Sequence, residues 1–250
     1  MSSASATASA SATASVVISP SGNSALRVAS VLADREVGWR LVHHLARFVD
    51  AARVPGVVCV IPTYDAALIE VDPSEVSLER LGEYLAAVVD GLDHDRPLTD
   101  APRTFDVPVL YDLPEHRADE LDLRMVADAQ GLGVEDVVRL HSEPTYVVRC
   151  LGAPGGSPML DGPPFPTPVP RLASPRAHVP QGVVSVAGRQ ATITPAAAPG
   201  GWPLIGRTPL TVLDLDAEPF VPYEPGDLIR FRAIDRDEYD ALLGTRMVAR

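Results

Sequence analysis

Prolines divide this chain into two parts of different character. Most of its 25 prolines follow residue 96. Proline has a fixed φ and no backbone N–H, so it interrupts helices and central strands. The second part is therefore predicted to form loops and short strands, whereas the first part can form longer helices. The 250 residues suffice for one large or two small domains, and the polar stretch 90–104 is the expected linker.

The first part alternates between strand and helix patterns. Residues 24–31 predict a strand, and Asp34 is the expected cap of a long helix. Residues 56–73 predict two strands around a turn, and Ser77 begins a second helix. This order favours a small α/β sandwich over residues 24–100, with the helices on one face of an antiparallel sheet.

The second part is predicted to be a barrel or a compact sandwich over residues 103–236. A strand at 105–112 and two short helices come first. Short β-branched runs then alternate with Gly/Pro turns, which is typical of such folds. The predicted helices are 122–130 and 134–140, and the later predicted strands are 145–151, 183–187, 190–194, 210–215 and 227–234.

Both ends of the chain are expected to lie outside these two domains. Residues 1–20 start as a Ser/Ala/Thr-rich stretch and are interpreted as a disordered tail. Residues 237–250 are charged and are interpreted as a C-terminal tail with a short helix. The chain shows no secretory signal pattern and no run of about 18 apolar residues. A cytoplasmic protein without a membrane partner is expected.

Every one of the 21 basic residues is arginine, and lysine is absent. The formal net charge of −12 disfavours nucleic acid and anionic membranes as partners. Without lysine the chain has no Walker-type phosphate loop and no amine to carry biotin or lipoate, so no covalently attached cofactor is expected. Any anion must be bound by arginine, by backbone N–H groups or by a partner protein.

Patterns of a self-sufficient catalytic site are missing from the sequence. It has no Gly-x-Ser-x-Gly elbow, no HExxH and no CxxC pair. Asp93, His94 and Asp95 are interpreted as a solvated turn, and no metal site is expected. Cys59 and Cys150 lie in apolar runs and are interpreted as buried free thiols, which fits a reducing cytoplasm.

The stretch APGGWPLIGRTPL, residues 198–210, is unusually apolar for a loop and contains one cation, Arg207. An arginine in such surroundings needs an anionic or carbonyl partner. Arg207 could therefore be a structural clamp, or it could bind a carboxylate or phosphate of a ligand. Trp202 could form the wall of a pocket or pack the end of a barrel.

Three further residues are candidates with open alternatives. Gln190 could hydrogen-bond an amide or lactam of a ligand, or satisfy a structural need. Arg176 is a weaker anion-binding candidate than Arg207. His141 ends a predicted helix, where it is either a capping or packing residue or a catalytic candidate.

Four segments of the second part stand in an order that resembles a known family. They read LHSEPTYVVRCLGAPGGSPML, PRAHVPQGVVSVAGRQATITP, APGGWPLIGRTPL and PGDLIRFRAI. On these motifs the chain is similar to the family of KipI and the B-type subunits of 5-oxoprolinase. That family is also called allophanate hydrolase subunit 1, or carboxyltransferase domain subdomain C/D. The resemblance covers roughly residues 24–234.

The resemblance implies an α+β fold, with a small N-terminal α/β sandwich followed by a C-terminal cyclophilin-like β-barrel. It implies a non-autonomous hydrolase subunit whose partner is a C-type homologue (allophanate hydrolase subunit 2), with an A-type homologue as a further candidate partner. The implied reaction is ATP-dependent hydrolysis of 5-oxoproline to glutamate, with ATP shared between the subunits. Two alternatives stay open: a KipI-like inhibitor of a sensor histidine kinase, and the carboxyltransferase component of a biotin-dependent urea-type carboxylase.

The resemblance also implies which residues form the site, and it shows one segment in which this chain differs from the family. In the family, the loop at 152–160 is rich in aromatic residues, but Ala153, Ser157 and Met159 stand there in this chain, which predicts an altered pocket wall. The catalytic candidates are Arg207, His141 and Gln190, and the ligand-binding candidates are Arg176, Gln190, Gly200, Gly201, Trp202, Arg207 and Thr208.

Overall fold

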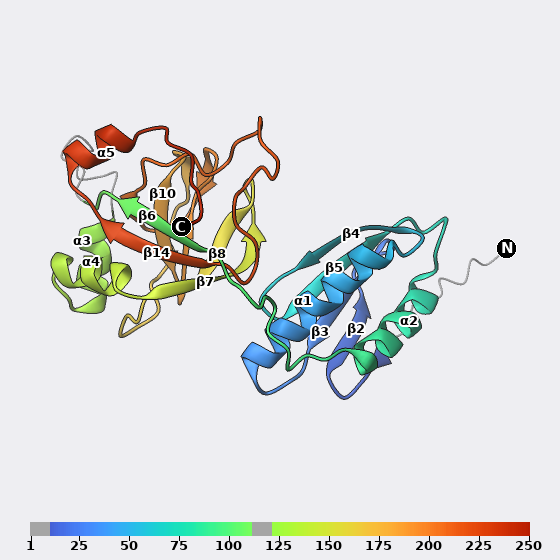
Figure 1. Ribbon diagram of the computed structural model, residues 1–250. Coiled ribbons are helices and arrows are strands. Elements are labelled where there is room, and N and C mark those ends of the chain that lie inside the picture. Colours follow the sequence, from blue (N-terminus) through green and yellow to red (C-terminus); the bar gives the residue numbers. More distant parts are fainter. Residues whose placement is uncertain (1–10, 112–121) are drawn as a thin grey trace. The chain divides into compact units, whose positions relative to one another are not determined.

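A computed structural model describes residues 11–111 and 122–250. The chain splits into two compact units, Met1–Asp100 and Ala101–Arg250, which the colours of Figure 1 follow from blue to red. No helix in these described ranges has the length and apolar character needed to cross a membrane.

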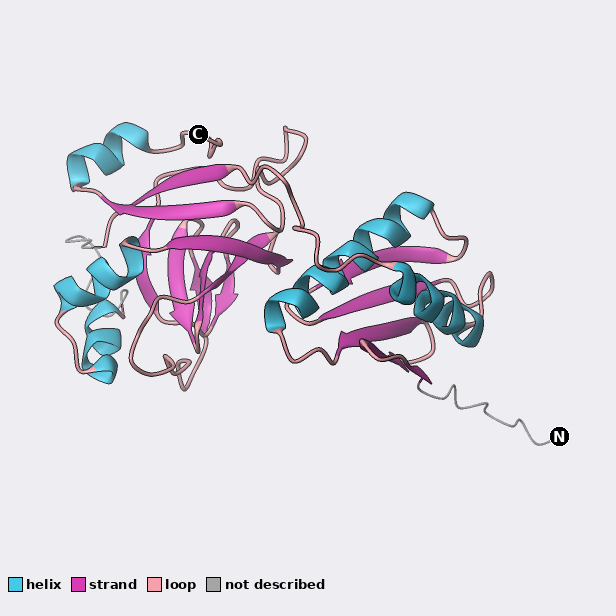
Figure 2. Ribbon diagram, turned by 60° about the horizontal axis from the view of Figure 1, so that its bottom comes forward, coloured by secondary structure: helices cyan, strands magenta, loops and turns pink. Residues whose placement is uncertain are grey.

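The first unit is an antiparallel sheet with two helices on one face (Figures 1 and 2). Asp34 caps α1 as expected, because its carboxylate accepts hydrogen bonds from the backbone N–H groups of Glu36 and Val37. Ser77 caps α2 in the same way. The strand order is β1-β2-β3-β5-β4. The elements are β1 (Ser11–Ala12), β2 (Val16–Pro20), β3 (Ala25–Ser30), α1 (Arg35–Ala52), β4 (Val57–Pro62), β5 (Ala66–Val71) and α2 (Leu78–Gly91).

The interpretation of residues 1–20 as a disordered tail is wrong for residues 11–20. β2 pairs with β3 along its whole length, from Val16 opposite Ser30 to Pro20 opposite Leu26. Val16 and Ile18 are buried in the core between sheet and helices. The apolar run VVISP was overlooked because it directly follows the Ser/Ala/Thr-rich stretch. Residues 1–10 lie outside the described ranges.

The second unit is a barrel-like sheet with a helical pair and a small ribbon beside it (Figure 2). Its seven strands follow the order β13-β10-β11-β8-β7-β14-β6, and β12 pairs with β9 separately. The strands are β6 (Thr104–Val109), β7 (Thr145–Gly152), β8 (Ser157–Asp161), β9 (Arg176–Val179), β10 (Val183–Ala187), β11 (Gln190–Ile193), β12 (Ala198–Gly200), β13 (Leu204–Arg207) and β14 (Leu228–Ala233); the helices are α3 (Leu123–Gln130), α4 (Val134–Ser142) and α5 (Arg236–Leu242).

The two edge strands of this sheet, β6 and β13, meet at one residue pair. Leu110 and Arg207 exchange two backbone hydrogen bonds, each 2.9 Å long from nitrogen to oxygen. A Cβ on Gly206 would stand 2.6 Å from Val109 Cγ1, so only glycine lets the two strands approach this closely. We call the pairing of Leu110 with Arg207 the seam, and it turns the open sheet into a nearly closed barrel.

Two predictions for the second unit are wrong. Residues 210–215 do not form a strand, and only Thr211 makes a bridge, to Arg246. Residues 237–250 are not a separate tail: α5 begins at Arg236, and Met247 is 1% exposed in the barrel core. The Met247 backbone N–H bonds the Thr211 carbonyl, so the last residues of the chain fasten onto the barrel wall.

Candidate functional site

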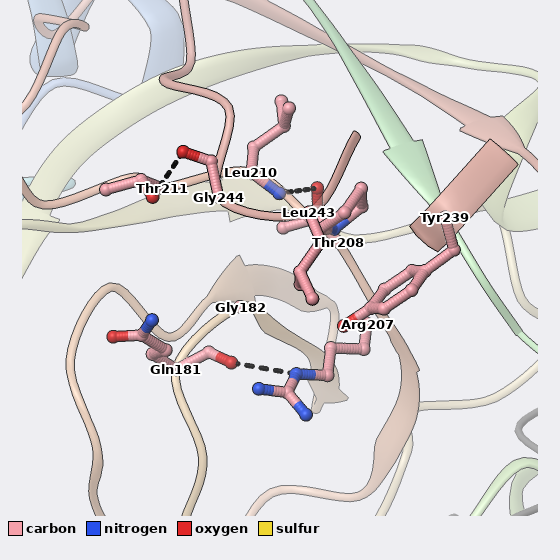
Figure 3. A pocket seen from close by; sticks show the side chains of 10 residues that line it. Gln181, Gly182, Arg207, Thr208, Leu210, Thr211, Tyr239, Leu243 and Gly244 are labelled. Carbon is pink, nitrogen blue, oxygen red and sulfur yellow. Dashed lines mark hydrogen bonds between the residues drawn. The ribbon is translucent and has the colours of Figure 1, made fainter. Parts of the chain in front are cut away.

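A small pocket with a volume of about 170 Å³ lies at the seam (Figure 3). Three segments that are distant in sequence form its walls. These are the approach to β10, the end of β13 with the turn after it, and the last part of the chain from α5 onward. The lining residues are Gln181, Gly182, Arg207, Thr208, Pro209, Leu210, Thr211, Tyr239, Leu243 and Gly244.

Arg207 is half-buried at this pocket, directly beside the seam hydrogen bonds of its own backbone. Its side-chain Nε donates a hydrogen bond to the Gln181 carbonyl oxygen, 3.1 Å away. Within residues 11–111 and 122–250, no carboxylate forms an ion pair with its guanidinium, and its two Nη groups make no hydrogen bond. Arg207 therefore clamps one carbonyl and keeps donors available to a ligand in the pocket (Figure 3).

Backbone contacts join Gly182 and Thr208, two of the residues that line the pocket. The Thr208 N–H donates to the Gly182 carbonyl at 2.8 Å. Gly182 has a φ of +79°, and a Cβ there would stand 2.6 Å from the Thr208 oxygen, so glycine is required. The buried Thr208 hydroxyl accepts a hydrogen bond from Leu210 N. Thr208 thus shapes the turn after β13 and lines the pocket.

Arg176 lies in a different place, where it forms a partly buried ion pair with Asp122. Its Nη2 donates to Asp122 Oδ1 at 2.7 Å, and the other carboxylate oxygen accepts from Leu204 N. The pair ties β9 and β13 to the start of α3, which is a structural task. The Arg176 Nη1 is buried and has no hydrogen-bond partner in the described part of the chain.

Trp202 and its two preceding glycines belong to this second region. Gly200 of β12 pairs with Arg176 of β9, and the Gly201 carbonyl accepts from Leu172 N. The Arg171 guanidinium lies 5.8 Å from the centre of the Trp202 ring, at cation–π distance. These contacts favour packing as the role of Trp202.

Gln190 stands at the hairpin between β10 and β11, opposite Ala187 and Asp161. The register of β10 with β13 pairs Val183 with Arg207, so Gln190 and Arg207 lie at opposite ends of β10. At about 3.3 Å per residue, the four steps along β10 from Val183 to Ala187 separate them by roughly 13 Å. The two side chains do not meet in one pocket.

His141 is fully buried among aromatic rings of the barrel core. Its Nδ1 lies 2.6 Å from the Tyr111 hydroxyl, and its carbonyl accepts from the Tyr146 hydroxyl. The ring of Phe231 packs 4.4 Å from it, centre to centre. Burial lowers the pKa of His141 from 6.5 to about 3, so the imidazole is neutral at pH 7. These contacts are those of a packing residue.

This burial predicts a pH-dependent stability of the second unit. The His141 imidazole has a pKa of 6.5 in the unfolded chain but about 3 in the folded one. The neutral imidazole therefore stabilises the folded state fully above pH 6.5, and this stabilisation falls as the pH drops toward 3. Between pH 7 and pH 5 the free energy of unfolding should fall by about 2 kcal/mol from this group. Urea unfolding at both pH values, compared between wild type and His141→Gln, measures it; an equal fall in both proteins would contradict the prediction.

The structure therefore separates the predicted site residues into two groups and two single residues. Arg207 and Thr208 line the seam pocket. Arg176 and the segment 200–202 lie together around the β9–β12 ribbon. His141 lies in the core, and Gln190 lies at a hairpin. Sequence reasoning missed Gln181, Tyr239 and Asp122. Asp122 could not be found because its ion-pair partner Arg176 is 54 residues away along the chain. Tyr239 could not be found because Arg207, which lines the same pocket, is 32 residues away. Gln181, in contrast, lies within the motif PRAHVPQGVVSVAGRQATITP that carried the resemblance.

Comparison with known proteins starts from a family model. The model for the carboxyltransferase domain, subdomain C and D, matches residues 16–223. The chain belongs to this family. The match begins at β2, so the strand misread as a tail is part of the family domain. It ends before β14 and α5, so Tyr239 and Leu243 of the seam pocket lie beyond it.

Curated relatives support the same assignment, because they are B subunits of 5-oxoprolinase. The B subunit of 5-oxoprolinase from Bacillus subtilis (strain 168) is 30% identical over 236 residues, which cover 88% of this chain and 93% of that protein. The B subunit of 5-oxoprolinase from Escherichia coli O157:H7 is 36% identical over 204 residues, which cover 80% of this chain and 86% of that protein.

A solved structure supports the fold. The Kluyveromyces lactis urea carboxylase matches with a TM-score of 0.72 at 19% identity, covering 94% of this chain and 24% of that longer chain. At this identity the likeness concerns the fold alone. It confirms the predicted α+β class with a cyclophilin-like barrel in the second unit.

Proposed function

We propose that this carboxyltransferase-domain C/D protein is the B-type subunit of an ATP-dependent 5-oxoprolinase. Its partners would be a C-type subunit, with an A-type protein as a third component, and together they would hydrolyse 5-oxoproline to glutamate. The observation that carries the proposal is the 30% identity to the B subunit of the Bacillus subtilis 5-oxoprolinase across 93% of that protein. The proposal includes a cytoplasmic location, which fits the two free cysteines.

The seam pocket does not fit a whole nucleotide. Its volume of about 170 Å³ is below the ~300–1,000 Å³ typical of pockets for drug-sized ligands. It offers one guanidinium, whereas a triphosphate needs several cations or a row of free backbone N–H groups. The proposal therefore assigns most of the ATP contacts to the partner proteins of the complex.

The residues of this chain fit a binding and positioning task. The lactam of 5-oxoproline is an unstrained amide and resists direct hydrolysis, so the complex must raise its electrophilicity, which is the chemistry that ATP supplies when bound. Arg207 can hold an anionic group of the substrate with its free Nη donors. The clamp from its Nε to Gln181 fixes the guanidinium before the ligand arrives, which reduces the entropy lost on binding.

The test is reconstitution from separately purified proteins. This chain is mixed with its C-type and A-type partners, and release of phosphate and glutamate is measured with and without 5-oxoproline. We expect 5-oxoproline-dependent ATP hydrolysis only when all required subunits are present. The same rate with this chain left out would overturn the proposal.

The two alternative functions are outcomes of the same experiment. A complex that carboxylates urea only when a biotin-bearing chain is added would favour the carboxyltransferase component, because this chain has no lysine to carry biotin. Inhibition of the autophosphorylation of a sensor histidine kinase by this chain alone, without 5-oxoproline turnover, would favour a KipI-like inhibitor.

A further inference from the structure

The seam pocket has a second donor, the hydroxyl of Tyr239, which belongs to α5. The ring of Tyr239 is 6% exposed and packs against Leu110, the residue that pairs with Arg207 across the seam. Figure 3 shows its hydroxyl directed toward the side chain of Arg207. In the described part of the chain this hydroxyl has no hydrogen-bond partner. Arg207 and Tyr239 thus both line this pocket with side chains that carry hydrogen-bond donors.

The charge inside this pocket is opposite to that of the chain as a whole. The chain has 33 acidic residues, but the ten lining residues include no acid and one cation. Several backbone N–H groups of the lining residues already have partners: Gly182 bonds Thr194, Thr208 bonds Gly182, and Gly244 bonds Pro209. The Arg207 Nη groups, the hydroxyls of Tyr239 and Thr208 and the Gln181 amide are therefore side-chain donors that remain for a ligand in the described part of the chain.

The remaining walls limit the size and polarity of the ligand. Pro209, Leu210 and Leu243 supply apolar surface beside the donors. A volume of about 170 Å³ suits a molecule of single-ring size. A guanidinium and a hydroxyl on one side, with aliphatic side chains on the other, match an anionic group carried by a compact apolar ring.

We propose that the seam pocket binds the carboxylate of a small ring-shaped acid, with Arg207 and the Tyr239 hydroxyl as its two donors. Naming 5-oxoproline as that acid rests on the proposed function. On this proposal the carboxylate of the acid is held by this chain, and the chemistry at the lactam is left to the partner proteins. Tyr239 and Leu243 lie beyond the family match, which ends at residue 223, so the family model itself does not include this wall of the pocket.

Three probes separate carboxylate binding from lactam binding. The full chain is titrated by ligand-observed NMR with 5-oxoproline, with cyclopentanecarboxylate, which has the acid but no lactam, and with pyrrolidin-2-one, which has the lactam but no acid. We expect the two acids to bind and pyrrolidin-2-one to bind at least ~10-fold more weakly, since hydrogen bonds to a charged group are worth about 1.5–3 kcal/mol. Equal binding of all three, or no binding of either acid, would overturn the inference.

Single substitutions locate the binding. Arg207→Gln should weaken the binding of both acids ~30-fold or more, and Tyr239→Phe should weaken it ~10-fold. Neither substitution should change the affinity for pyrrolidin-2-one. Arg189→Gln is the matched arginine control, because Arg189 is exposed at the far end of β10, and Tyr84→Phe is the tyrosine control in the first unit. Unchanged binding by Arg207→Gln or by Tyr239→Phe would contradict the assignment, and so would equal losses in the controls.

The design distinguishes this inference from the proposed function. If the acids bind in an Arg207-dependent way but the reconstituted complex does not hydrolyse 5-oxoproline, the assignment of the pocket is supported and the proposed function is rejected. If the complex hydrolyses 5-oxoproline and Arg207→Gln leaves the KM for 5-oxoproline unchanged, the proposed function is supported and the assignment of the pocket is rejected.

Discussion

Replacing Asp227 with alanine is expected to lower the free energy of unfolding of the second unit by about 3 kcal/mol. Asp227 is 5% exposed and accepts hydrogen bonds from the backbone N–H groups of Arg103 and Glu224. It also forms an ion pair with the Arg103 guanidinium. Without the carboxylate these partly buried donors lose their partner together, and a hydrogen bond to a charged group is typically worth about 1.5–3 kcal/mol.

The measurement uses the two tryptophans of the chain, one in each unit. In a Trp39→Phe background, the fluorescence of Trp202 follows urea unfolding of the second unit alone. Asp106→Ala is the matched control: Asp106 is exposed and pairs loosely with Arg250 at 3.7 Å, so its loss should change stability by less than about 1 kcal/mol. An equal loss of unfolding free energy in the two variants would show that the hydrogen bonds and ion pair of Asp227 do not stabilise the second unit more than an exposed ion pair does.

Gly206→Ala is expected to open the seam and to destabilise the second unit by about 3 kcal/mol. The new Cβ would stand 2.6 Å from Val109 Cγ1 and 3.1 Å from the Leu110 carbonyl oxygen. One of these neighbours is backbone that already bonds Arg207, so the strands must separate. Overpacking of this kind typically costs about 1–3 kcal/mol of stability. The cost at Gly206 is expected near the top of this range, because one of the crowded neighbours is backbone and cannot rotate away as a side chain can.

The same substitution should weaken ligand binding at the pocket, because Arg207 follows Gly206 directly. Urea unfolding reports stability, and titration with cyclopentanecarboxylate below the unfolding range reports the pocket. Gly91→Ala, at a glycine with no atom within 4 Å of its added Cβ, is the control for a glycine substitution in this chain. A Gly206→Ala protein with wild-type stability and affinity would mean that the seam does not hold the pocket.

Local features of the fold could be predicted from the sequence, because they are encoded within a few residues. Asp34 and Ser77 each precede an apolar helical pattern and satisfy the first N–H groups of that helix, so both helix starts were predicted correctly. The strand β10 was predicted over residues 183–187, as observed. β13 was missed, because Pro203 and Gly206 make residues 204–207 look like a loop.

Features that depend on distant pairings could not be predicted. The seam joins residues 97 positions apart, and Asp122 meets Arg176 across 54 positions. The motif PGDLIRFRAI pointed to the family, and the structure gives its Asp227 a structural task. The apolar character of residues 198–210 has a similar cause, because this stretch supplies a barrel strand and one side of a seam.

The parallel pairing of β6 with β14 has a consequence for synthesis of the protein. β6 is the first strand of the second unit and β14 is its last, and they pair along their whole length from Thr104 to Val109. The ribosome must therefore make nearly the entire chain before β6 finds its neighbour. The first unit has its own core and can fold while the barrel strands are still being synthesised. During that time β6 has no β14 to pair with, and the edge that will face β14 stays unpaired. Contacts this distant slow folding, and the exposed edge is where a nascent chain of this family is most open to aggregation or to a chaperone.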